Sequence, residues 1–281
     1  MKRIQLVVTG KCERLALHLS LGQLFPSAQW LTPIAVDSFT SAPLTEAPPR
    51  GVKRTLEKFA DKLIGFVDES GAETLVVGVD DLELESPADL TVTVVRDAVE
   101  SALMGPNWAL SAPRRERLQS EVASRCSFHL LVPMVEAYFF ADPAALGRAG
   151  ARGRSTFDPA LCDVEDFLVE DERYLAPEDT SEKHDWCRGG TQRARHPKRY
   201  LKFLSGDGTP GSWSYRESRE GEAALRSLDW ALVLATSTWA RAARALIDDI
   251  ASFMEADQFP GLLLETTALS THRRSRTLRN V

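Results

Sequence analysis

A short apolar run that ends in carboxylates constrains this sequence more than any other feature. Residues 74–87 read TLVVGVDDLELESP, so the run from Leu75 to Val79 is followed at once by Asp80, Asp81, Glu83 and Glu85. An apolar run of this length predicts a strand buried on both faces, as in the interior of a parallel sheet. Because unpartnered charges are costly to bury, the acids predict a solvated turn, a helix N-terminus or a cation site.

Two other apolar runs resemble the first, and segments with helical spacing separate them. Residues 4–8 and 127–132 predict strands like the one at 74–79. Apolar residues at helical spacing predict a helix over 52–67 and, with a less regular period, over 13–25. Further helices are expected over 89–103 and 116–123, and another begins at 133. Buried strands that alternate with helices predict an α/β fold, in which helices flank a parallel-type sheet on both sides.

The pattern changes along the chain and predicts three parts. Residues 1–148 form the α/β core, and residues 149–195 form a loop-rich, charged insertion. Residues 196–281 contain apolar-periodic segments at 223–228, 230–235 and 239–254, which predict a helical C-terminal cap packing on the core.

Composition narrows the class of protein. No apolar run approaches the roughly 18 residues that span a bilayer, and the apolar stretch at 4–8 is too short for a signal peptide, so we expect a cytoplasmic protein without membrane contact. The four cysteines are unevenly spaced, which is not typical of a disulfide framework. The net charge of −6 argues against a general nucleic-acid coat but not against a nuclease, whose site is itself acidic.

Acidic residues follow each of the three predicted strands. Glu13 follows the first, Asp80, Asp81 and Glu83 follow the second, and Glu136 follows the third. Parallel sheets place their chemistry at the carboxyl ends of strands, so these acids predict a pocket that holds Mg²⁺ or Mn²⁺. Alternatively, Glu13 is only a first-turn helix acid, and Glu136, which stands among apolar residues, has one specific partner.

Four segments taken in order, VVTGKCE, LVVGVDDLELE, VPMVEAYFFAD and HPKRYLKFL, resemble the Toprim-like proteins. This fold is shared by topoisomerases, primases and overcoming-lysogenization-defect-type nucleases, and the chain looks closest to the stand-alone Toprim-like proteins of bacterial defence loci. The resemblance covers roughly residues 4–204, with a gap over the loop-rich middle.

The resemblance implies a role for each matching residue. Gly10 and Glu13 match a VEGxTE-like motif, so Glu13 would be the metal-binding or acid–base glutamate, although Thr9 stands where the family usually has its first glutamate. Asp81 and Glu83 match a DxD-like metal motif, with Asp80 one residue earlier. Glu136 matches a further acidic position and would complete the metal site, and Lys198 resembles a lysine placed near the scissile phosphate.

The segment around Lys198 is basic. Residues 188–202 carry six Lys and Arg side chains and no acid, and we expect nucleic-acid contacts from Arg193, Arg195, His196 and Arg199. A second basic stretch from 272 onward predicts a solvated tail. A zinc site from Cys162, His184, Cys187 and His196 is an alternative, although the gaps do not match a zinc finger.

Together these features predict a Mg²⁺- or Mn²⁺-dependent nuclease that hydrolyses DNA, tRNA or another RNA as the effector of an anti-phage defence system. The alternative is a non-catalytic Toprim-like module that binds a partner ATPase or a nucleic acid, and a third reading is a metal-dependent phosphatase acting on a small nucleotide. No phosphate-binding loop is present, so an ATPase would come from a partner chain. A homo-oligomer is also compatible with the sequence.

Overall fold

The computed structural model describes residues 1–41, 43–108, 111–176, 190–206, 214–237, 239–255 and 277–281. The chain divides into two compact units. Unit 1 comprises Met1–Gly10, Phe25–Leu130 and Ala242–Val281, and unit 2 comprises Lys11–Leu24 and Leu131–Arg241. The first strand therefore belongs to unit 1 and the helix that follows it belongs to unit 2.

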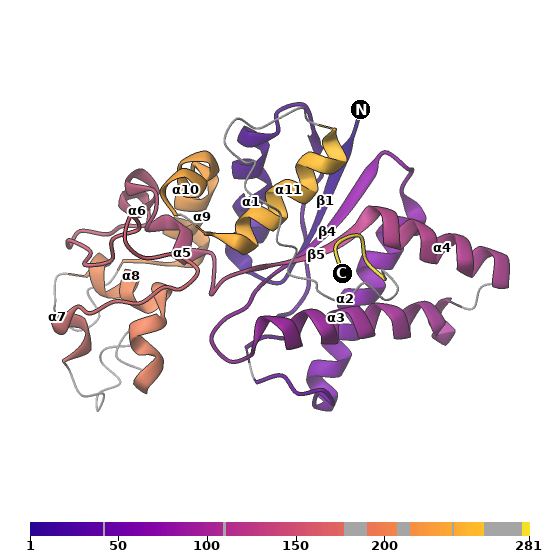
Figure 1. The fold of residues 1–281 in the computed structure, drawn as a ribbon, viewed down its shortest axis with the longest axis horizontal. Helices are drawn as coiled ribbons and strands as arrows, with labels where there is room; N and C mark the ends of the chain where they lie inside the picture. The colour runs from indigo at the N-terminus through magenta and orange to yellow at the C-terminus, as the bar shows by residue number, and fades with distance from the viewer. Residues whose placement is uncertain (42, 109–110, 177–189, 207–213, 238, 256–276) are drawn as a thin grey trace. The chain divides into compact units, whose positions relative to one another are not determined.

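Unit 1 is built on a five-stranded sheet among the described residues (Figure 1). Its strands are β1 (Arg3–Val8), β2 (Gln29–Trp30), β3 (Ile34–Ala35), β4 (Thr74–Asp81) and β5 (Cys126–Leu131). The order is β2-β1-β4-β5, with β3 also paired to β1, and β1 runs parallel to β2, β3 and β4. The predicted α/β fold with a parallel sheet and flanking helices is confirmed.

The strands are apolar because both faces of the sheet are covered. Nearly every side chain of β1, β4 and β5 is buried, as expected of strands rich in apolar residues. Phe59 packs against Phe128 edge to face, with ring centroids 5.8 Å apart. A Cβ atom on Gly78 would lie 2.8 Å from the Phe59 ring, so the glycine in β4 makes room for this aromatic pair.

The helices of unit 1 are α2 (Arg50–Glu69), α3 (Ala88–Met104), α4 (Ala112–Arg125) and most of α11 (Arg241–Met254), with a 3₁₀ turn η1 (Pro106–Trp108). Helix α2 packs on β1 and β4, α3 packs on α2, and α4 packs on α2 and β4. The apolar residues of α2 recur at three- and four-residue intervals, and Leu56, Phe59, Leu63 and Val67 are buried. The opposite face of α2 is charged and exposed, as expected of an amphipathic surface helix.

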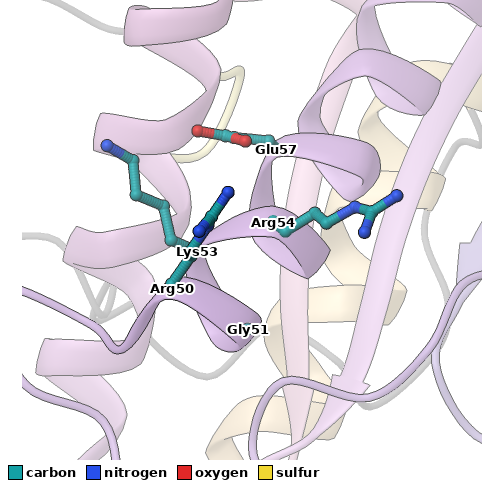
Figure 2. Close-up of a pocket in the computed structure, with 5 residues that line it drawn as sticks. All are labelled: Arg50, Gly51, Lys53, Arg54 and Glu57. Carbon is teal, nitrogen blue, oxygen red and sulfur yellow. The ribbon is translucent and has the colours of Figure 1, made fainter.

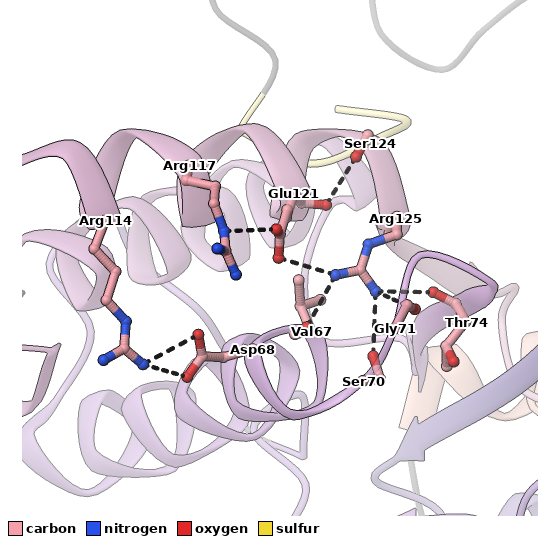
Figure 3. Close-up of polar contacts among 10 residues, drawn as sticks. All are labelled: Val67, Asp68, Ser70, Gly71, Thr74, Arg114, Arg117, Glu121, Ser124 and Arg125. Atoms are coloured by element: carbon pink, nitrogen blue, oxygen red, sulfur yellow. Dashed lines mark hydrogen bonds and ion pairs between the residues drawn. The ribbon is translucent and has the colours of Figure 1, made fainter.

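A buried arginine joins α4 to the end of α2 (Figure 3). Arg125 is 7% exposed. Its guanidinium donates to the carbonyl oxygens of Val67 at 3.0 Å and Gly71 at 2.9 Å. It also donates to Ser70 Oγ at 3.2 Å and pairs with Glu121 at 3.1 Å. The planar fork of arginine reaches these acceptors at once, which the single ammonium of lysine cannot do.

Arg125→Met is expected to lower the free energy of unfolding by about 3 kcal/mol, because several buried acceptors lose their donor. Arg125→Lys should recover only a minor part of this loss. Urea denaturation measures the effect. Arg117→Met is the matched control: Arg117 lies on the same helix, pairs with the same Glu121 and is 73% exposed, so its loss should stay below about 1 kcal/mol. Equal losses for the two variants would contradict the prediction.

Unit 2 is helical in its described part. Its helices are α1 (Lys11–Leu24), α5 (Glu136–Phe139), α6 (Pro143–Arg148), α7 (Glu172–Leu175), α8 (Pro197–Ser205), α9 (Glu222–Arg226) and α10 (Trp230–Thr236), with a 3₁₀ turn η3 (Gly190–Arg195) and a π-helical turn η4 (Glu217–Gly221). Aromatic rings pack against one another in its core, where Phe140 stacks on Tyr200 with ring centroids 5.8 Å apart. The Trp230 indole also donates to Ser20 Oγ at 3.0 Å.

The expected helices and strands correspond to observed ones, with ends that differ by up to four residues, and two of these differences concern the predicted acids. Strand β4 runs on through Asp81, so Asp80 and Asp81 lie in its last two positions rather than beyond it. The helix expected from 133 begins at Glu136 and lasts one turn. The roles of 149–195 as an insertion and of 196–281 as a cap stay predictions, since residues 177–189 and 256–276 lie outside the described part.

Two further observations bear on the class of protein. Within the described ranges, no helix combines the length and apolarity needed to cross a bilayer. Cys12, Cys126 and Cys162 are free thiols, and Cys187 lies outside the described residues.

Candidate functional site

The carboxyl ends of β1 and β4 bring Thr9 and Asp80 together in unit 1. These strands are parallel, with Val8 opposite Val79. The next residue of each chain segment, Thr9 after Val8 and Asp80 after Val79, therefore lies beside the other. The Thr9 hydroxyl donates a hydrogen bond to Asp80 Oδ1. Two neighbouring strands of the sheet thus fix the orientation of one carboxylate.

Asp80 is a buried carboxylate with an incomplete set of partners. Its side chain is 1% exposed, and Oδ2 has no hydrogen-bond partner among the described residues. Burial raises the pKa of Asp80 from 3.8 to about 7, against the opposing effect of the Thr9 and Thr40 hydroxyls, and the charge of Glu83 raises it further. Near neutral pH this group therefore exists in both protonation states.

Asp81 and Glu83 follow Asp80 and are half-buried. Glu83 has a φ of 54°, in the left-handed region that costs an ordinary residue energy. Helix α3 begins only at Ala88, so these acids precede the helix and do not cap it. Among the interpretations that the sequence left open, the helix N-terminus is therefore wrong for the segment from Asp80 to Glu85.

Two further buried carboxylates, Glu13 and Glu136, lie in unit 2. Glu13 is in the first turn of α1, Glu136 begins α5, and each is 2% exposed. Burial raises the pKa of Glu13 to about 8. The backbone N–H of Glu13 and the charge of Lys198 act in the opposite direction, whereas Glu136 and Glu217 add to the rise. Glu13 Oε1 has no hydrogen-bond partner among the described residues.

Tyr215 orients Glu136. Its hydroxyl donates to Glu136 Oε1 at 2.7 Å, and both groups are buried. Burial, reinforced by the negative charge of Glu136, keeps the pKa of Tyr215 well above its usual value, so the phenol stays a donor. A Cβ atom on Gly221 would lie 2.7 Å from Tyr215 Oη and 3.4 Å from Cys12 Sγ. The glycine at the end of η4 therefore leaves the space that Tyr215 occupies.

Lys198 contributes a cation to the same unit. It lies in the first turn of α8 and forms an ion pair with Glu217, the first residue of the π-helical turn η4. Lys198 also lowers the pKa of Glu13. The resemblance places the ammonium of Lys198 near the scissile phosphate. In this structure the carboxylate of Glu217 balances that positive charge.

The predicted nucleic-acid contacts occupy different surroundings. Arg193 is 9% exposed and donates to the Leu175 carbonyl oxygen. Its Cζ atom lies 5.7 Å from the centroid of the Tyr174 ring, so Arg193 contacts two residues of α7. Arg195 is exposed, whereas His196, the N-cap residue of α8, and Arg199 are half-buried. Arg188, His184 and Cys187 lie outside the described residues, as does the basic tail up to Arg276.

The structure therefore sorts the predicted acids into two sets. Glu13, Glu136 and Lys198 interact within unit 2, and Asp80, Asp81 and Glu83 belong to unit 1. Within the described ranges, no group of three or more His, Cys, Asp or Glu side chains is arranged as a metal site.

Sequence reasoning missed four residues of these sets, Thr40, Tyr215, Glu217 and Gly221. None stands in a motif, and Tyr215 is 79 residues away from Glu136 along the chain. Gly221 is the one residue of the four whose type is itself a signal, because a glycine often marks a place where another group lies close to the backbone.

Comparisons with models of protein families, with curated proteins and with solved structures find no match to this chain. The resemblance to Toprim-like proteins accordingly remains an inference from the four quoted segments.

Proposed function

We propose that the chain is a divalent-cation-dependent hydrolase of nucleic-acid phosphodiester bonds, with Asp80 as the primary carboxylate of the cation site. One observation supports this more than any other: Asp80 is buried at the carboxyl end of a central strand, with an oxygen that has no hydrogen-bond partner among the described residues. An ionised carboxylate in that position is costly, and a bound cation would offset the cost.

The residues around Asp80 fit Mg²⁺ or Mn²⁺ by their chemistry. Asp80, Asp81 and Glu83 offer hard oxygen atoms, with neither thiolate nor imidazole among them. Mg²⁺ is commonly bound through one or two carboxylates while it keeps several waters, so a set of three protein ligands is not required. Such an ion would activate a water and polarise a phosphoryl oxygen.

The side chains of the protein would have separate tasks. Thr9 holds Asp80 through Oδ1 and leaves Oδ2 for the cation. For Glu13, in unit 2, the proposal keeps the acid–base role that the Toprim-like resemblance implies, and a pKa of about 8 would let this side chain hold and release a proton near neutrality. For Lys198, also in unit 2, the proposal keeps the role near a phosphate that the resemblance implies, and that role requires the side chain to leave Glu217. The proposal keeps the effector role in anti-phage defence that the Toprim-like resemblance implies, with an ATPase as the partner chain.

A second candidate is a binding module without catalysis. Two observations favour it: Thr9 stands where the resemblance expects a glutamate and already engages Asp80, and Lys198 is paired with Glu217. Such a module would bind a partner ATPase or a nucleic acid and would not need a cation.

The test is incubation of the purified full chain with plasmid DNA and with total tRNA, in Mn²⁺, in Mg²⁺ and in EDTA. We expect cleavage of one substrate class that depends on the metal, is lost in Asp80→Ala/Asp81→Ala and persists in Glu85→Gln, which removes an exposed acid of the same segment. Absence of cleavage together with absence of a metal-induced thermal shift would contradict the proposal and favour the binding module.

A further inference from the structure

The first two turns of α2 in unit 1 carry a group of exposed cations. Arg50, Lys53 and Arg54, together with Gly51 and Glu57, line an open depression on the protein surface. Figure 2 shows the three basic side chains extending from these turns, with Glu57 one turn further along the helix. We call Arg50, Lys53 and Arg54 the α2 basic patch. It stands out on a chain whose net charge is −6.

The cations of the α2 basic patch form no ion pair with any described residue, Glu57 included. The arginines of the neighbouring helix α4 behave differently: Arg114 pairs with Asp68 at 3.1 Å, and Arg117 pairs with Glu121 at 3.0 Å (Figure 3). The patch therefore keeps its full positive charge for a partner outside the described chain.

The position of the patch gives it no evident role in stabilising the helix. The first turn of α2 contains no acid, and Pro49 at the N-cap provides no side-chain hydrogen bond. Cations at this end of a helix oppose the helix dipole, whereas cations at the other end would favour it. The arrangement is electrostatically unfavourable within the protein and becomes favourable when an anion binds.

The positive charge also extends along the helix. Arg50, Arg54, Lys58 and Lys62 are exposed and follow one another at intervals of four residues. At a rise of 1.5 Å per residue, these positions span about 18 Å along α2. A single phosphate would reach only one end of such a row, whereas a chain of phosphates would follow its length.

We infer that the α2 basic patch and its extension through Lys58 and Lys62 contact the phosphodiester backbone of a nucleic acid. The choice of nucleic acid among polyanions rests on the proposed function. A membrane surface fits less well, because the apolar residues of α2 are buried in the core and offer no exposed apolar face to lipid. A small anion fits less well too, since no buried polar side chain lines the depression.

Binding in EDTA tests this inference separately from cleavage. Fluorescence anisotropy would follow the full chain on a DNA duplex, on single-stranded DNA and on tRNA between about 50 and 200 mM salt. Arg50→Gln/Arg54→Gln is compared with Arg114→Gln/Arg117→Gln, which removes the same charge from exposed positions of another helix in unit 1. Further samples contain inorganic phosphate alone and vesicles with an anionic lipid.

We expect the patch variant to bind nucleic acid roughly tenfold more weakly and the slope of log affinity against log salt to fall by about 2. The control should stay within about twofold of the wild type. The thermal midpoint of the patch variant should be unchanged or higher, since cations leave the N-terminal end of a helix. Equal weakening of both variants, no weakening, no binding by the wild type, saturable binding of phosphate alone or binding to the vesicles would each overturn the inference. Loss of cleavage with binding intact would count against the proposed function only.

Discussion

Asp80→Asn is expected to abolish metal-dependent cleavage, by roughly a thousandfold or more, and at the same time to make the protein more stable at about pH 8. Activity should fall because the substituted amide keeps an acceptor for the Thr9 hydroxyl but loses the charge that holds the cation. Stability should rise because the wild-type carboxylate is buried and lacks a partner for Oδ2 among the described residues.

The sign of the stability effect follows from the pKa of Asp80. Burial raises it from 3.8 to about 7, so the folded state holds the proton more tightly than the unfolded chain does. The contribution of Asp80 is therefore most favourable below about pH 4 and is lost as the pH rises towards 7. The full difference corresponds to about 4 kcal/mol, and asparagine does not incur it.

Thermal unfolding of wild type and Asp80→Asn between about pH 5 and pH 8, each with Mg²⁺ and with EDTA, measures both effects. Mg²⁺ should stabilise the wild type most at the higher pH and should leave the variant unchanged, because the cation replaces the missing partner of the carboxylate. Glu85→Gln is the control and should respond to Mg²⁺ as the wild type does. A variant that is less stable than the wild type at the higher pH would show that the Asp80 charge is already compensated within the protein.

Glu13→Gln is expected to stabilise the protein above about pH 8, by up to about 5 kcal/mol. Burial raises the pKa of Glu13 from 4.5 to about 8, and the neighbouring Glu136 adds to the rise. The folded state therefore favours the protonated form. The stability of the wild type should fall as the pH rises from about 4.5 to 8, and glutamine should remove most of this fall.

Urea denaturation across this pH range measures the effect of Glu13→Gln on stability. Glu170→Gln, which removes an exposed acid of unit 2, is the control. The control should keep the pH dependence of the wild type. Tyr215→Phe should behave in the opposite way to Glu13→Gln, because it deprives Glu136 of its 2.7 Å hydrogen bond and leaves a buried acceptor unsatisfied. A Glu13→Gln variant with the pH dependence of the wild type would contradict the raised pKa of Glu13.

The strands and helices could be predicted because their signals are local. An apolar run marks β1, β4 and β5, and apolar residues at three- and four-residue spacing mark α2. The end of β4 was misplaced by two residues for a physical reason. Strand pairing follows backbone hydrogen bonds, which continue through Asp80 and Asp81 although their side chains are polar.

The partners of the acids could not be predicted, because they come from distant parts of the chain. Thr9 reaches Asp80 across 71 residues, and Tyr215 reaches Glu136 across 79. The sequence by itself determined the parallel sheet, the positions of Asp80, Glu13 and Glu136 near strand ends, and the amphipathic character of α2. Only the tertiary structure decided that Glu13 and Glu136 share one buried set, that Asp80 belongs to another, and that the cations of α2 lack a described partner. Hydrophobic periodicity acts between neighbours along the chain, whereas burial and electrostatic interaction depend on distances that exist only after folding.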